Sequence, residues 1–155
     1  MPFTSGRPPA PEEVDELYAR DYEEACLTLA QSPKASAALS RRCLQNILRE
    51  KAGVKKSNLA KEIDEVIDNR TLTPALAESL LEIKSIANFN IYPTKSTAAG
   101  EIVDAEPEEA EWMLDVLELM FDLYFVQPAK LKAKREALNK KLTDSGKSPL
   151  GVAAK

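Results

Sequence analysis

The stretch PEEAEWMLDVLELMFDLYFVQ at residues 107–127 decides the fold of this 155-residue chain. Between residues 112 and 126 only Asp115, Glu118 and Asp122 are polar, and steps of three or four residues place them on one narrow stripe of a helix. A helix that is apolar around most of its circumference must be covered on most sides. This one is therefore either the central helix of a bundle or shared between the core and a dimer interface.

Capping residues and prolines predict where four earlier helices begin. The starts are Pro11, Ser32-Pro33, Ser57-Asn58 and Thr73-Pro74. The first helix is expected to reach about Gln31 and to include Leu17 among its apolar positions, and Gly53 is expected to end the second. No run of residues has the pattern of a strand, so the sequence predicts an all-α fold, a single bundle of about five helices.

Proline also marks both ends of the predicted bundle. Residues 1–11 are proline-rich and lack periodicity, so they are expected to form an extended or disordered arm. Pro128 is expected to break the fifth helix, and residues 129–142 to form a basic helix whose leucines give only a thin apolar edge. The predicted organisation is an arm, a helical domain at 12–128, and a basic helical extension with a tail at 129–155.

Composition excludes several classes of site. The chain contains no histidine, which excludes serine–histidine and cysteine–histidine nucleophile pairs and the common zinc sites with histidine ligands. No metal and no cofactor are expected. Cys26 and Cys43 are expected to be small core residues in a reducing cytoplasm. The sequence has no signal peptide and no stretch that spans a bilayer, so a cytoplasmic protein without membrane contact is expected.

Charge is distributed unevenly along the chain. Residues 130–155 carry eight lysines or arginines and two acids, a net of +6, whereas residues 1–129 carry thirteen against twenty-three, a net of −10. An acidic body with a basic tail is able to bind nucleic acid or an acidic partner. The alternative, which is preferred at this point, is a solvated tail that keeps the protein soluble.

The candidate site lies at residues 83–93, IKSIANFNIYP, a pattern typical of the last turns of a helix that stops at a proline. Residues four apart share a helix face, so Lys84, Asn88 and Tyr92 form one polar row that is expected to line a cleft. The alternative is a plain helix C-terminus at which Asn88 or Asn90 bonds the free carbonyl groups.

Arginines of the second predicted helix make a second candidate surface. Arg41, Arg42 and Arg49 are a plausible but unspecific nucleic-acid patch. The preferred interpretation is an arginine face that pairs with the acids of neighbouring helices. The candidate residues for binding a nucleic acid or nucleotide are Arg41, Arg42, Lys84, Asn88 and Asn90.

Several short motifs occur in an order that resembles a known family. They are DYEEA (21–25), SPKAS (32–36), ALSRRCLQ (38–45), IKSIAN (83–88) and PEEAEW (107–112). Through them, residues 12–128 resemble the bacterial domain of unknown function 4145 family, which is grouped with the HEPN (higher eukaryote and prokaryote nucleotide-binding) helical bundles. The resemblance implies a single HEPN-like bundle, frequent pairing as dimers, and an association with phage defence.

The resemblance also bears on catalysis. Active HEPN proteins are metal-independent endoribonucleases that use an arginine and a histidine from each subunit. In this chain Lys84 stands where the arginine is expected, Tyr92 where the histidine is expected and Ala87 where a glycine is expected, whereas Asn88 matches. Lysine does not reproduce the bidentate guanidinium fork, and tyrosine is a poor general base at neutral pH. No catalytic residue is therefore assigned, and a protein that is not an enzyme is preferred.

Three functions remain open. The preferred one is a non-catalytic HEPN-like interaction module, with a protein partner and a role in phage defence or a stress response. The second is a binder of RNA or nucleotides without chemistry. The third is a ribonuclease with a degenerate site, in which Lys84 binds phosphate, Asn88 orients it and Tyr92 acts as the acid.

The fifth helix also predicts a homodimer. Trp112, Phe121, Tyr124 and Phe125 are assigned to the core or to a dimer interface, because such aromatic side chains left in water create an apolar patch that soluble monomers avoid. The expected assembly has two-fold symmetry, with the fourth or fifth helix near the axis.

Overall fold

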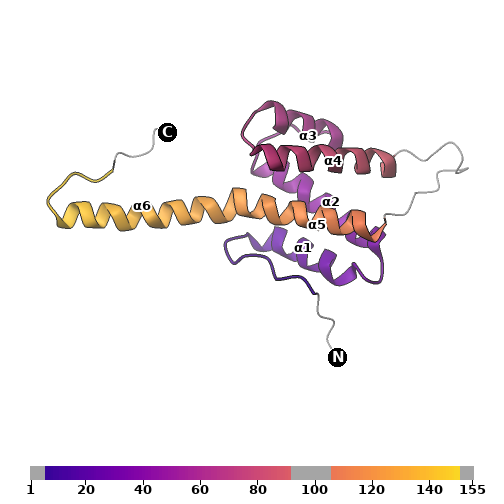
Figure 1. Ribbon diagram of the computed structural model, residues 1–155, viewed down its shortest axis with the longest axis horizontal. Helices are drawn as coiled ribbons and strands as arrows, with labels where there is room; N and C mark the ends of the chain where they lie inside the picture. The colour runs from indigo at the N-terminus through magenta and orange to yellow at the C-terminus, as the bar shows by residue number, and fades with distance from the viewer. Residues whose placement is uncertain (1–5, 92–105, 151–155) are drawn as a thin grey trace, which may run out of the picture.

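The computed structural model describes residues 6–91 and 106–150 of the chain, and only the backbone of residues 86–91. Its helices are α1 (Glu16–Thr28), α2 (Pro33–Glu50), α3 (Leu59–Asp68), α4 (Pro74–Ile91), α5 (Pro107–Phe121), the π-helical turn η2 (Asp122–Val126) and α6 (Gln127–Asp144). The described residues contain no strand. The fold is all-α, as predicted, with α1 to α5 forming a bundle and α6 continuing from α5 through η2 (Figure 1).

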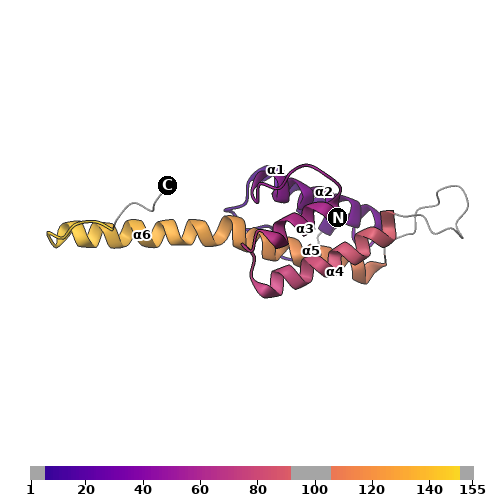
Figure 2. The same cartoon turned by 90° about the horizontal axis from the view of Figure 1, so that it is seen from above.

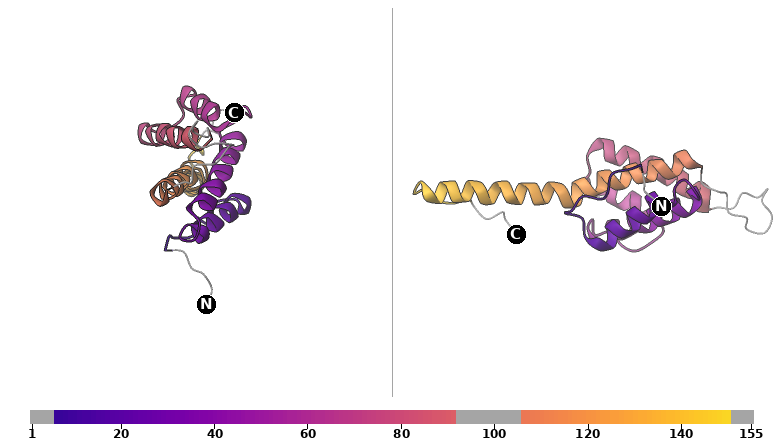
Figure 3. Two further views of the ribbon diagram at one scale, coloured as in Figure 1. Left: turned by 90° about the vertical axis from the view of Figure 1, so that its right-hand side faces the viewer. Right: turned by 90° about the horizontal axis from the view of Figure 1, so that it is seen from below.

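Helix α5 lies at the centre of this bundle. It packs against α1, α2 and α4, while α3 packs against α2 and α4. Seen along the long axis in Figure 3, α1 to α4 curve around α5 and leave one of its sides open. Helix α6 lies outside the bundle, and Figure 2 shows it projecting far beyond the other helices. The chain thus joins a helical body to one extended helix.

The burial of α5 agrees with the central position predicted for it. Met113 and Leu114 are almost completely buried, and Trp112 and Tyr124 are partly buried against the same core. Leu119 differs, because it is 46 % exposed on the open side of the helix. One chain therefore covers most of α5, except for a narrow strip.

Four aromatic side chains join α5 and η2 to α1. The ring centroids of Tyr18 and Phe125 are 5.4 Å apart, as are those of Tyr22 and Phe121, and Phe121 and Phe125 are 6.2 Å apart. Phe121 is fully buried and Phe125 is 7 % exposed. Of the two assignments left open for these phenylalanines, core or dimer interface, their burial against α1 of the same chain favours the core.

Side-chain caps fix the starts of α2, α3 and α4 where the sequence predicts them. The side-chain oxygens of Ser32, Asn58 and Thr73 accept hydrogen bonds of 3.1, 2.9 and 3.2 Å from the N–H group three residues later. Gly53 follows α2 with a φ of 75°, a conformation that side chains with a Cβ rarely adopt. These signals act within one turn, so they do not depend on the rest of the fold.

Helix α1 begins five residues later than predicted, at Glu16 rather than Pro11. The carbonyl group of Pro11 instead accepts a hydrogen bond of 3.0 Å from the N–H group of Val14, and this turn buries Val14. The turn sets the direction in which α1 leaves, and Leu17 lies off the buried face with 56 % exposure. The prediction that Leu17 belongs to the apolar stripe is therefore wrong.

Pro128 does not break the helix, contrary to the prediction. It lies in the first turn of α6, directly after the π-helical turn, and the helical turns continue from α5 through η2 into α6. Within the π turn the N–H group of Gln127 donates to the carbonyl oxygen of Asp122, five residues earlier. The wider turn accommodates a proline, which lacks an N–H group and collides with the preceding turn of a regular α-helix.

Candidate functional site

Lys84, the cation of the predicted polar row, lies on α4 and reaches toward α3. Its Nζ atom donates to Oδ1 of Asp64 at 2.7 Å. The Lys84 side chain is 31 % exposed and that of Asp64 is 50 % exposed. A lysine that already has a carboxylate partner offers less net charge to a phosphate group, so this ion pair weakens the case for Lys84 as a phosphate ligand.

The rest of the predicted polar row lies outside the described side chains. Asn88 and Asn90 belong to the last turns of α4, of which the structure describes the backbone as far as Ile91. Tyr92 lies outside the described residues. The cleft formed by Lys84, Asn88 and Tyr92 therefore stays a prediction.

Arg42 and Arg49 on α2 pair with acids of neighbouring helices, as the preferred interpretation has it. Arg42 donates from Nη2 and Nε to the two carboxylate oxygens of Asp21, at 2.6 and 3.2 Å. These hydrogen bonds raise the pKa of the Arg42 guanidinium. Arg49 donates from Nε to Glu62 on α3 at 2.5 Å. Neither arginine is left as an uncompensated cation.

Arg41 differs from the other two arginines of α2. It is half-buried, and its Nε atom has no hydrogen-bond partner in the part of the chain that the structure describes. Burial lowers the pKa of its guanidinium. Of the three arginines on α2, Arg41 is therefore the one without a carboxylate partner among the described residues.

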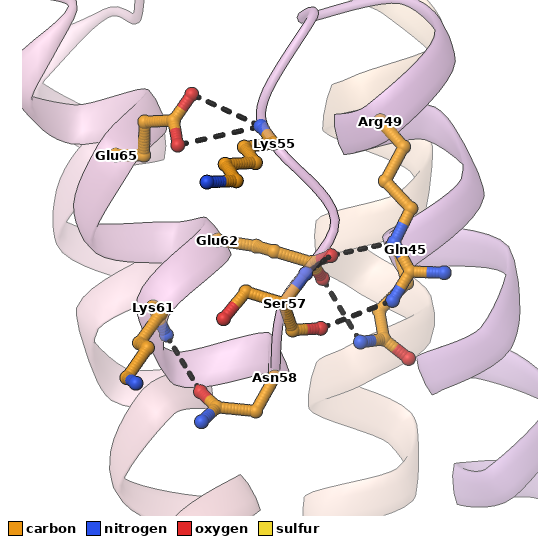
Figure 4. Close-up of polar contacts among 8 residues, drawn as sticks. All are labelled: Gln45, Arg49, Lys55, Ser57, Asn58, Lys61, Glu62 and Glu65. Atoms are coloured by element: carbon orange, nitrogen blue, oxygen red, sulfur yellow. Dashed lines mark hydrogen bonds and ion pairs between the residues drawn. The ribbon is translucent and has the colours of Figure 1, made fainter.

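Glu62 is the centre of a polar network that sequence analysis does not single out. Its side chain is fully buried. It accepts hydrogen bonds from Nε2 of Gln45 at 2.9 Å, Nε of Arg49 at 2.5 Å and the backbone N–H of Ser57 at 3.0 Å (Figure 4). Arg49 also donates from Nη2 to the carbonyl oxygen of Ser57 at 3.1 Å. The network joins α2, α3 and the segment between them.

Glu65, one turn after Glu62, holds the same connecting segment. Its carboxylate accepts from the backbone N–H of Lys55 at 3.1 and 3.3 Å (Figure 4). Through these hydrogen bonds the cluster fastens α3 and the connecting segment to α2. The signal for Glu62 is present in the sequence, because it lies three residues after Leu59 and four before Val66 on the inward face of α3.

The open side of α5 is acidic. Glu111, Asp115 and Asp122 are exposed there. Nη2 of Arg7, from the arm before α1, lies 2.5 Å from Oδ1 of Asp115 and 2.8 Å from Oε2 of Glu118. The arginine pins the described end of the arm to this face, yet the Asp115 side chain stays 51 % exposed.

Helix α6 presents an open basic surface. The structure describes all of its side chains, and none is buried. Leu131 and Leu138 are 63 % and 44 % exposed, which agrees with the predicted thin apolar edge. No acid of the described residues lies within ion-pair distance of its basic side chains, which are Lys130, Lys132, Lys134, Arg135, Lys140 and Lys141.

Two hollows lined by described residues border α5. One, of about 490 Å³, lies between the end of α1 and the start of α5, with Arg7 and Leu27 in its lining. The other, of about 170 Å³, lies between the start of α4 and η2, with Leu119 and Leu123 in its lining. Neither of these two includes Lys84, so neither is the cleft predicted from the polar row.

The cysteines are core residues, as predicted. Both Cys26 and Cys43 are buried, and burial raises the pKa of the Cys43 thiol to about 12. Among the described residues no three acidic or cysteine side chains are grouped to hold a metal ion. None of the helices in the described ranges combines the length and the apolar character that crossing a membrane requires.

Comparison with known proteins bears on the family of the chain. No curated protein and no solved structure matches it. The family described as "Domain of unknown function (DUF4145)" matches residues 23–141. The matched range continues past Pro128 into α6, so it includes most of the basic helix as well as the bundle. Because the match covers well over half of its length, the chain belongs to the DUF4145 family.

Proposed function

We propose that this protein is a non-catalytic, HEPN-like interaction module that binds a partner through α6. The observation that carries the proposal is the placement of this helix: 18 residues project from the bundle with no buried side chain. Among the described elements α6 packs only against η2, and its lysines have no acidic partner there. A helix gains most of its stability in proteins from packing, so an unpacked helix with exposed leucines is suited to a partner.

Two features support the non-catalytic part of the proposal. The chain has no histidine, the side chain that most often acts as a general acid or base near neutral pH. Lys84, at the position where active relatives are expected to carry an arginine, is held by Asp64. The chain therefore has no histidine to activate a ribose hydroxyl group, and the ion pair with Asp64 keeps Lys84 from that role.

Incubation with a quenched fluorescent single-stranded RNA tests this part. We expect the RNA to stay intact, both with Mg²⁺ and with a chelator. Lys84→Arg with Tyr92→His restores the residue types expected of an active HEPN site, and cleavage by that variant alone would reveal a dormant nuclease. Cleavage by the natural chain that Tyr92→Phe abolishes would overturn the proposal.

A nucleic-acid binder is the second candidate. The observation that favours it is the set of uncompensated cations, formed by Arg41 on α2 and the lysines of α6. If RNA lies along α6, its affinity should fall as the salt concentration rises. A plot of log affinity against log salt concentration should have a slope of about −3 to −4, since each phosphate contact contributes about −0.7. Fluorescence anisotropy at several salt concentrations measures this slope. A signal without salt dependence would exclude this candidate.

The biological setting of the module follows from the resemblance. The resemblance to HEPN-like proteins supports a role in phage defence or a stress response. The buried cysteines suit a reducing cytoplasm. Deleting the gene and challenging the host with phage tests this role, and unchanged plating efficiency would count against it. A homodimer stays a prediction for this module. Phe121 and Phe125 are covered within one chain, so pairing requires a different surface.

A further inference from the structure

Helices α5, η2 and α6 form one unbroken helix with two oppositely charged halves. The acidic half, residues 107–126, contains six acids and no basic residue. The basic half, residues 127–144, contains six basic residues and two acids. At about 1.5 Å per residue the whole helix is roughly 55 Å long, so the two halves are well separated.

The π-helical turn places the two kinds of charge on one face. On α5, steps of three and four residues connect Glu108, Glu111, Asp115 and, through Leu119, Asp122. The next step is five residues, because the N–H group of Gln127 donates to the carbonyl oxygen of Asp122 and so lies directly above it.

The same face continues along α6 as a basic row. Steps of three, four and seven residues from Gln127 reach Lys130, Lys134 and Lys141, with Leu131 and Leu138 beside them. All of these side chains are exposed. The face is therefore a single strip, acidic along one half and basic along the other.

We propose that a second copy of this chain covers this strip, with the two long helices antiparallel about a two-fold axis at η2. The spacing of the charges suits that arrangement. Glu108 and Lys141 are equally distant in sequence from the point between Tyr124 and Phe125, and so are Asp115 and Lys134. Glu108 and Asp115 of one copy then lie level with Lys141 and Lys134 of the other, whereas Glu111 and Asp122 lie level with Leu138 and Gln127.

The charges favour this occupant over the alternatives. A parallel pair would place acid beside acid and lysine beside lysine, which is repulsive. A nucleic acid would meet the acidic half of the strip with the wrong charge and would leave Leu119, Leu131 and Leu138 in water, where they are 46 %, 63 % and 44 % exposed. An antiparallel copy avoids the charge repulsion and also covers the leucines. It brings the apolar side chains near η2 together and places acids beside lysines.

Arg7 does not block the strip. It neutralises part of the charge of Asp115 and Glu118, but these side chains remain 51 % and 39 % exposed. The segment after α6 folds back on a different face, because Asn139, whose Oδ1 accepts from the N–H of Leu150, lies about 100° around the helix from Leu138. Both ends of the strip are therefore accessible.

Charge exchange between two variants tests the proposal, which rests on the proposed interaction module. One variant carries E108K, E111K and D115K, and the other carries K130E, K134E and K141E. Light scattering over a range of concentrations should give twice the chain mass of 17.1 kDa for the natural protein, with a dissociation constant that rises with salt. Each variant alone should bind itself roughly 100-fold more weakly, because each level pair becomes repulsive.

Mixing the two variants is the decisive arm. An equimolar mixture should recover a dimer, since the strip of one variant, basic except for Asp122, then faces the acidic strip of the other. This recovery also shows that both variants are folded. K132E with K140E and K147E is the matched control, because it changes the net charge equally away from the strip and should leave the dimer intact.

Two results would overturn the pairing. One is a natural protein that stays at the mass of a single chain at all concentrations and at low salt. The other is a dimer that survives in each charge variant alone. Neither result changes the RNA cleavage or RNA binding measurements, on which the non-catalytic module stands. Conversely, cleavage of RNA would overturn the proposed function without altering the mass.

Discussion

Replacing Glu62 by alanine removes the fully buried carboxylate that ties α3 to α2. Three donors lose their acceptor: Nε2 of Gln45, Nε of Arg49 and the N–H of Ser57, at 2.9, 2.5 and 3.0 Å. Hydrogen bonds to a charged group contribute about 1.5–3 kcal/mol each, but water entering beside the 26 % exposed Arg49 side chain recovers part of that. The free energy of unfolding should therefore fall by about 3–5 kcal/mol, as for other buried pairs that lose one partner.

Urea unfolding followed by circular dichroism measures this loss. Glu65→Ala is the matched control on the same helix, and it should cost only about 0.5–1.5 kcal/mol because its two bonds from the Lys55 N–H are exposed. Removing both charges, in Glu62→Met with Arg49→Met, should destabilise less than Glu62→Ala, since no charged donor is then left without its carboxylate and methionine fills more of the vacated space than alanine does. A loss below about 1 kcal/mol for Glu62→Ala, or equal losses for Glu62→Ala and Glu65→Ala, would refute the reasoning.

Three further predictions concern single positions. Ser32→Ala should lower the free energy of unfolding by about 1 kcal/mol through loss of the α2 cap, whereas Ser79→Ala, within α4, should change it by less than about 0.5 kcal/mol; equal urea midpoints would contradict this. Gly53→Ala should cost about 1–2 kcal/mol, because its φ of 75° strains any side chain, and an unchanged melting temperature would exclude that conformation. Burial raises the pKa of Cys43 from about 9 to about 12. The contribution of the buried thiol to stability is therefore complete below pH 9, and above pH 9 the free energy of unfolding should fall by about 1.4 kcal/mol per pH unit. The comparison is with Cys43→Ala, whose stability should fall less steeply over the same range, and identical pH profiles would contradict the shift.

Local signals predicted much of the fold. Ser32, Asn58 and Thr73 each cap a helix through a bond that spans three residues, so the sequence alone places those starts. The same kind of reasoning failed at Pro11 and Pro128. A proline restricts its own φ and removes one donor, but the neighbouring turn decides whether a helix starts, stops or continues. At Pro11 that turn is stabilised by burial of Val14, which depends on the rest of the bundle.

Prediction of functional surfaces was limited by tertiary pairing. Pairing of Arg42 with an acid of a neighbouring helix was the preferred interpretation, whereas Lys84 was expected to face a cleft. In neither case does spacing within one helix identify the partner, which is Asp21 for Arg42 and Asp64 for Lys84. Glu62 was overlooked because a carboxylate is expected at the surface, although its spacing places it on the inward face of α3. The basic helix, in contrast, was recognised from charge alone, since solvated side chains need no tertiary partner.

The single attachment of α6 has a mechanical consequence. Among the described elements this helix packs only against η2, and its 18 residues extend about 27 Å from that attachment. A rotation of about 20° at the π turn would therefore displace the far end of α6 by about 9 Å. Phe125 is part of this turn and contacts the rings of Tyr18 and Phe121. A change in the packing of these rings would therefore move η2 directly. A small change of angle at η2 would therefore give a large displacement at the far end of α6.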